Sequence, residues 1–176
     1  KEYHSNGSIA HLNFARNTKD KEAIKENKFY DEIGPEIAAI DNQFTKAIDA
    51  SKFKKDLLAE FGKHYFDLIS MELKSFDPKL VDLMKKENEL SNEYRSLLAG
   101  AEIKYKGKTL NLAGLSPFMQ DTSRETRKEA YQLLDGFFKE NEEKLDLIFD
   151  KLVKVRNKKS DILNFDNFIP LGYLNM

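Results

Sequence analysis

Apolar side chains recur every three or four positions along most of the chain, a spacing that places them on one face of an α-helix. This pattern predicts a mainly α protein, a bundle of long antiparallel amphipathic helices. The stripes are Ile37, Ile40, Phe44 and Ile48; Phe53, Leu57, Leu58 and Phe61; Tyr65, Phe66, Ile69 and Leu73; Leu80, Leu83, Met84, Leu90, Tyr94, Leu97 and Leu98; Ala130, Leu133, Leu134, Phe137 and Phe138; and Leu145, Ile148, Phe149, Leu152, Val155 and Ile162.

Glycine, proline and capping residues predict where the first helices begin and end. Gly34-Pro35 separates two helical patterns, and proline suits the first position of the second helix. Ser51 is a predicted N-cap of a short helix that Gly62 ends. Asp77-Pro78 then begins a helix of about twenty residues that Gly100 ends.

The spacing of the apolar residues changes from a helical to an alternating pattern in the middle of the chain. Ile103 and Tyr105 alternate with polar residues, Lys106-Gly107 supplies a turn, and Leu110 and Leu112 alternate after it. The pattern predicts a β-hairpin near 102–112. Because two strands alone are only marginally stable, we expect this hairpin to pack on helices.

Two further long helices are predicted after the hairpin. Ser116-Pro117 is interpreted as an N-cap followed by a proline at the first helical position. Amphipathic patterns then predict helices at about 123–141 and 142–163. The tail, 164–176, keeps large apolar residues and has no polar end, so we expect the chain to continue.

We therefore expect three regions along the chain. Residues 1–100 would form an N-terminal helical part, 101–112 the hairpin, and 113–176 a C-terminal helical part that continues into an absent domain.

Glu87 interrupts an otherwise apolar stripe. We expect it to lie at the edge of its helix. A buried polar contact is the alternative, and it would require a partner for the carboxylate.

Charge and composition limit the classes of function. The chain has 29 basic and 30 acidic residues and a formal charge of −1. A nucleic-acid-binding domain normally carries a basic surplus, so we expect no nucleic-acid partner. No apolar run approaches the length of a membrane span, and the first ten residues lack the apolar core of a signal peptide. The absence of cysteine excludes disulfides and thiolate chemistry, and we expect a cytoplasmic protein with no membrane partner.

The three histidines do not predict a metal site. A catalytic zinc needs about three protein ligands, but none of His4, His11 and His64 begins a His-Glu-x-x-His motif. His4 and His11 could share a helix face, although Asn6-Gly7 between them weakens that helix. We expect no zinc ligand and no catalytic residue in this chain.

Other catalytic and binding patterns are equally weak. Gly114-Leu115-Ser116 is half of a nucleophile elbow, but Phe118 replaces its second glycine. The many carboxylates are expected on solvated helix faces. A basic run is the best candidate for a patch that binds nucleic acid or an acidic partner, although cations are also favoured near a helix C-terminus; it comprises Lys151, Lys154, Arg156, Lys158 and Lys159.

The order of several short segments resembles the oligoendopeptidase F family, zinc metallopeptidases related to thimet oligopeptidase. The resemblance extends from about Asn13 to Met176 and rests on joint order and spacing. The segments are Phe61-Gly62; Glu87-Asn88-Glu89-Leu90 with Glu93-Tyr94; Ile103 to Gly107; Asp121 with Arg124, Arg127 and Ala130; Asp150 to Arg156; Asn164 to Phe168; and Leu171-Gly172-Tyr173.

The resemblance implies a mostly helical enzyme with a deep channel that admits short peptides. It also implies zinc held by a His-Glu-x-x-His helix and a later glutamate, with the motif's glutamate as general base. That motif would lie downstream of the matched region, so no functional residue is carried over. The family usually has an arginine before the methionine that Met176 matches, whereas Asn175 stands here.

We therefore expect the helical N-terminal region of a zinc oligoendopeptidase, with zinc in the parent enzyme only. Its partners would be the catalytic domain of the same protein and short peptide substrates, and the fragment alone could form a homodimer. Exposed apolar surface is expected to be largest near residues 142–163 and the tail. A stand-alone helical interaction module is the alternative, and a small metalloenzyme built from the three histidines is a third hypothesis.

Overall fold

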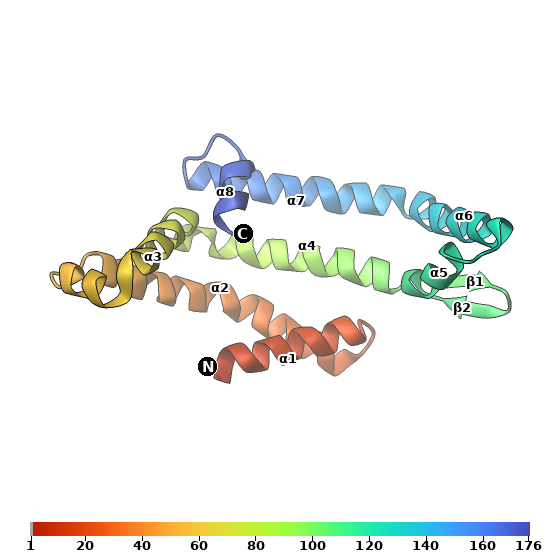
Figure 1. Cartoon of the computed structure of the whole chain (residues 1–176), viewed down its shortest axis with the longest axis horizontal. Helices are drawn as coiled ribbons and strands as arrows, with labels where there is room; N and C mark the ends of the chain where they lie inside the picture. The colour runs from red at the N-terminus through yellow and green to blue at the C-terminus, as the bar shows by residue number, and fades with distance from the viewer. Residues whose placement is uncertain (1) are drawn as a thin grey trace. The chain divides into compact units, whose positions relative to one another are not determined.

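The protein is described from a computed structural model of residues 2–176, which form eight α-helices, one 3₁₀ turn and a two-stranded hairpin (Figure 1). The prediction of a mainly α protein with one small hairpin is confirmed. In chain order the elements are α1 (Glu2–Arg16), α2 (Lys21–Asp49), α3 (Lys54–Ser75), η1 (Pro78–Leu80), α4 (Val81–Ala99), β1 (Ile103–Tyr105), β2 (Lys108–Leu110), α5 (Leu112–Met119), α6 (Arg124–Glu140), α7 (Glu142–Ile162) and α8 (Phe168–Leu174).

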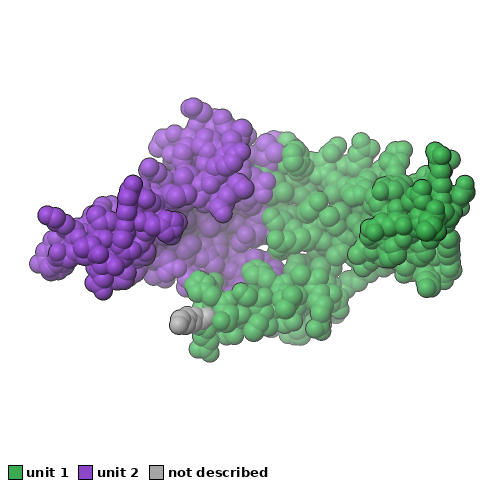
Figure 2. All heavy atoms as spheres, viewed as in Figure 1, with its two compact units in different colours: residues 1–25, 90–152 green, residues 26–89, 153–176 purple. Residues whose placement is uncertain are grey.

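The chain divides into two compact units (Figure 2). One unit contains Lys1–Lys25 and Leu90–Leu152, and the other contains Glu26–Glu89 and Val153–Met176. Helices α2, α4 and α7 each contribute residues to both units. The expected division at residues 100 and 112 stays a prediction.

In the first unit, the hairpin forms as the sequence predicts and packs on helices. β1 and β2 are antiparallel, with Ile103 opposite Leu110. Lys106 and Gly107 both have positive φ, 48° and 75°, as a two-residue hairpin turn requires. The Tyr105 ring meets the Phe118 ring of α5 edge-on at 5.0 Å between centroids, which anchors the hairpin to the helical part of its unit.

The α6 helix begins within one residue of its predicted start, whereas the N-cap predicted at Ser116 is wrong. Ser123 accepts a hydrogen bond from the Thr126 backbone N–H, and α6 begins at the next residue. Ser116 is not an N-cap: α5 already begins at Leu112, because the Asn111 side chain accepts a hydrogen bond from the Gly114 N–H at 2.8 Å. Pro117 consequently lies inside α5.

In the second unit, α2 runs through Pro35, so the predicted helix boundary at Gly34-Pro35 is wrong. Proline lacks the N–H that would bond the carbonyl four residues earlier, here that of Asp31. The Asn88 side chain of α4 donates to this Asp31 oxygen at 3.0 Å. An amide from another helix therefore replaces the donor that Pro35 removes, and the helix continues.

The face that α2 buries is also different from the predicted one. The apolar pattern places Ile40 and Phe44 in the core, but their exposed fractions are 61% and 67%. Asn27, Asn42 and Thr45 are buried instead. Part of the reason is a polar contact with α3, in which the Thr45 hydroxyl donates to Glu72 Oε1 at 3.0 Å.

Helix α3 contains the predicted break at Gly62, whose φ of 83° and ψ of 164° are not helical. Its start lies later than expected. Phe53, and not Ser51, occupies the N-cap position, while Ser51 Oγ accepts from the Phe53 N–H at 3.2 Å. Asp77 is confirmed as a cap, since its carboxylate accepts from the Lys79 N–H at the start of η1.

The C-terminal segment folds into a short helix. Asn164 has a φ of 60°, and the Phe165 N–H bonds the Ser160 carbonyl at 2.9 Å, an arrangement typical of a helix end. Asn167 then caps α8 through the Ile169 N–H, and Leu171 is completely buried. The tail is thus anchored to its own unit.

Candidate functional site

Three charged side chains of the second unit form a compact ion-pair cluster between α4 and α7. Glu87 Oε1 accepts a hydrogen bond from Arg156 Nε at 2.7 Å, and Glu87 Oε2 accepts one from Lys159 Nζ at 2.8 Å. The side-chain exposures are 17% for Glu87, 11% for Lys159 and 39% for Arg156. Glu87 is partly buried, which does not contradict the expected helix-edge position, and the polar contact that the alternative requires is present.

Helical spacing positions the two cations of this cluster. Arg156 and Lys159 are three residues apart on α7, so both reach the same carboxylate. Arg156 also lies over the Phe168 ring of α8, with 5.4 Å between the guanidinium carbon and the ring centroid. The cluster therefore connects α4, α7 and α8.

The electrostatics of Glu87 suit a structural role. Burial alone would raise the pKa of Glu87, but the hydrogen bonds from Lys159 and Arg156 outweigh it and lower the pKa below its ordinary value of 4.5. A general acid or base works best with a pKa near the operating pH. Glu87 is instead a permanent carboxylate at neutral pH, with both oxygens engaged by cations.

The basic run predicted on α7 is partly used inside the protein. Arg156 and Lys159 bind Glu87, whereas Lys151 and Lys158 are exposed. The sequence could not reveal this difference, because Glu87 lies 69 positions before Arg156 and nothing local connects them.

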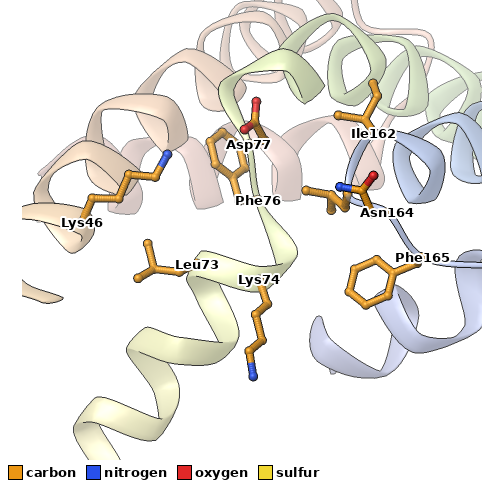
Figure 3. A pocket seen from close by; sticks show the side chains of 9 residues that line it. Lys46, Leu73, Lys74, Phe76, Asp77, Ile162, Asn164 and Phe165 are labelled. Carbon is orange, nitrogen blue, oxygen red and sulfur yellow. The ribbon is translucent and has the colours of Figure 1, made fainter. Parts of the chain in front are cut away.

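A cleft of about 510 Å³ opens near the ends of α3 and α7 in the second unit (Figure 3). Its apolar lining comes from both helices and from the loop that follows α7. The lining residues are Lys46, Leu73, Lys74, Phe76, Asp77, Ile162, Leu163, Asn164 and Phe165.

The polar groups of this cleft suit binding more than bond-making. In Figure 3, Lys46 extends toward Phe76 and Asp77, whereas Lys74 points away from them. The Asp77 carboxylate already serves as a helix cap. The lining combines apolar side chains with charged groups, and sequence periodicity contains no signal of such a cleft.

The three histidines are distributed over two helices. His4 and His11 lie on α1, which is continuous through Asn6-Gly7 despite the predicted weakness, and His64 lies on α3 in the other unit. Within residues 2–176, no three histidine, cysteine, aspartate or glutamate side chains come together as a metal site would require. No helix in this described part of the chain could span a membrane.

Comparison with known proteins gives one sequence family and several solved structures. Residues 1–76 match the family described as Peptidase M3 N-terminal domain. The comparison with curated proteins finds no match.

The structural matches cover almost the whole chain. An oligoendopeptidase F structure from Bacillus anthracis str. Ames is 38% identical, with a TM-score of 0.92 over 96% of this chain and 31% of that chain. A second oligoendopeptidase F structure is 35% identical and PZ peptidase A with inhibitor 2 is 37% identical, each with a TM-score of 0.92 over 96% of this chain and 30% of that chain.

The chain therefore spans less than a third of the length of these solved proteins. Its agreement with them in both sequence and fold extends well beyond the 76 residues of the family match. We conclude that this chain is an oligoendopeptidase F-type segment of the peptidase M3 family, with that family's N-terminal domain in residues 1–76.

Proposed function

We propose that this chain is the non-catalytic helical part of a zinc-dependent oligoendopeptidase and forms a wall of the channel that admits short peptides. The observation that carries the proposal is the agreement with oligoendopeptidase F structures over 96% of this chain but only 31% of the relative. Catalytic chemistry would then belong to the remaining polypeptide of such an enzyme.

Among residues 2–176, the arrangement of histidines and acidic side chains supports the assignment of zinc to other polypeptide. A catalytic zinc centre needs about three protein ligands and an open position for water. His64 lies in a different unit from His4 and His11, and Glu87 is held by two cations that would oppose a metal ion. We therefore assign zinc, the general base and bond cleavage to polypeptide outside this chain, and derive no catalytic step here.

Peptide hydrolysis by a hybrid protein tests this proposal. In the hybrid, this chain replaces the matched segment of the Bacillus anthracis oligoendopeptidase F. We expect the hybrid with zinc to hydrolyse short fluorogenic peptides but not a folded protein substrate, and the isolated chain with zinc to hydrolyse neither.

Two results would contradict the proposal. Turnover by the pure isolated chain would place catalytic groups within residues 1–176. A folded hybrid that binds zinc but leaves all peptides uncut would mean that this chain does not serve in place of the matched segment. A folded but inactive hybrid would favour the alternative function, that of a stand-alone helical interaction module.

A further inference from the structure

Helix α2 exposes an apolar face and buries a partly polar one. Five large apolar residues follow one another at intervals of four, four, three and four positions, which keeps them on one face. We call this set the α2 stripe; it comprises Phe29, Ile33, Ile37, Ile40 and Phe44. Phe29, Ile40 and Phe44 are exposed, and Ile33 and Ile37 are only half-buried.

The buried face of α2 combines the small apolar residues Ala23 and Pro35 with three polar residues. Asn42 is 1% exposed, and neither polar atom of its amide has a hydrogen-bond partner within residues 2–176. Asn27 and Thr45 are buried on the same side. Ordinarily an amphipathic surface helix buries its apolar stripe and hydrates its polar face.

This inversion indicates that both faces of α2 are contact faces. An apolar stripe left in water forgoes the favourable free energy of burying each large side chain. The stripe contains no charged residue that would keep it soluble. Contiguous exposed apolar surface of this kind is typical of an interaction site.

The comparison structures contain much polypeptide that has no counterpart in this chain. They have the same fold over 96% of this chain, yet about 70% of each relative's polypeptide lies outside the match, since the matched part is 30–31%. Resting on the proposed function, we infer that the α2 stripe is the docking face for the remaining polypeptide of an oligoendopeptidase F-type enzyme. This assigns the contact to α2 rather than to the exposed apolar residues of α7, such as Phe149.

Cysteine accessibility tests this assignment, because the chain has no native cysteine. Phe44→Cys reports on the stripe and Phe149→Cys on α7; both native side chains are 67% exposed, so the exchange should leave folding intact. Gln43→Cys is the control on the exposed polar flank of α2. Maleimide labelling of each variant is followed by mass spectrometry in the isolated chain and in the hybrid.

We expect the thiol of Phe44→Cys to react readily in the isolated chain and at least about tenfold more slowly in the hybrid, as for a site opened only by local unfolding. The labelling rate of Gln43→Cys should change by less than about twofold. An unchanged rate for Phe44→Cys in the hybrid overturns the inference, and protection of Phe149→Cys alone would place the contact on α7. Protection of Phe44→Cys in the isolated chain that grows with concentration would assign the stripe to a second copy, which also overturns it.

The hybrid separates this inference from the proposed function. A hybrid that hydrolyses peptides while the thiol of Phe44→Cys stays reactive keeps the function and removes the docking face. A folded hybrid in which that thiol is protected but peptides remain intact keeps the docking face and removes the function.

Discussion

Removing the Glu87 carboxylate should be far more costly than removing a neighbouring carboxylate on the same helix. In Glu87→Ala, Lys159 keeps its charge at a side-chain exposure of 11% without an anionic partner. Breaking a fully buried ion pair from one side costs about 3–5 kcal/mol. Because Arg156 is 39% exposed and regains water, we expect a loss of roughly 2–4 kcal/mol in the free energy of unfolding.

Glu89→Ala provides the matched control. Glu89 lies two positions further along α4 and binds Lys86 at 2.7 Å, but both side chains are more than half exposed. Exposed ion pairs contribute at most about 1 kcal/mol. Urea unfolding at pH 7, followed by circular dichroism, measures both variants. A Glu87→Ala cost equal to that of Glu89→Ala would refute the account of the cluster.

A second substitution tests the physical cause. Glu87→Met alone leaves the Lys159 ammonium without its anionic partner. Adding Lys159→Met removes that charge and should recover much of the lost stability. When Glu87 is present, the same Lys159→Met change should be destabilising. Equal effects of Lys159→Met in both backgrounds would mean that the two side chains are not coupled.

Three other predictions follow from single residues. Hydrogen bonds lower the pKa of Glu87, so the stabilisation by its charged form is present above the unfolded pKa of 4.5 and is lost as pH falls through the lower folded pKa. Urea unfolding measures the difference in the free energy of unfolding between the native protein and Glu87→Gln. This difference should stay constant near neutrality and narrow on acidification below about pH 4.5. Asn88→Ala should cost roughly 1–2 kcal/mol by removing the hydrogen bond from its side chain to the Asp31 carbonyl. Urea unfolding should show a smaller cost in a Pro35→Ala background, and an equal cost would contradict the role assigned to the amide. Gly62→Ala should destabilise the protein by about 1–3 kcal/mol in thermal unfolding, because the φ and ψ of Gly62 are accessible essentially only to glycine. The control is Gly136→Ala inside α6, where an added Cβ meets nothing within 4 Å. This change should be neutral or stabilising in the same measurement.

Local chemistry made several parts of the fold predictable from sequence. The Asp77 cap and the Lys106-Gly107 turn each depend on residues within a few positions of one another. The break at Gly62 belongs to the same class. Such features need no knowledge of the tertiary structure.

Features that depend on distant residues were predicted wrongly or not at all. Pro35 indicates a helix boundary in the sequence because the compensating Asn88 amide lies on another helix. The face that α2 buries could not be inferred from hydrophobicity, because the pattern predicts burial of the apolar face with Ile40 and Phe44. The structure instead exposes both residues and buries the face that contains Asn42. Glu87 could be given partners only once α4 and α7 were placed side by side in their unit.

The most direct test of the central claim is the zinc content of the isolated chain and of the hybrid, measured in parallel by elemental analysis after equilibration with zinc. The account predicts one zinc ion per folded hybrid molecule and no stoichiometric zinc on the isolated chain. One tightly held zinc per isolated chain, accompanied by peptide hydrolysis, would contradict it.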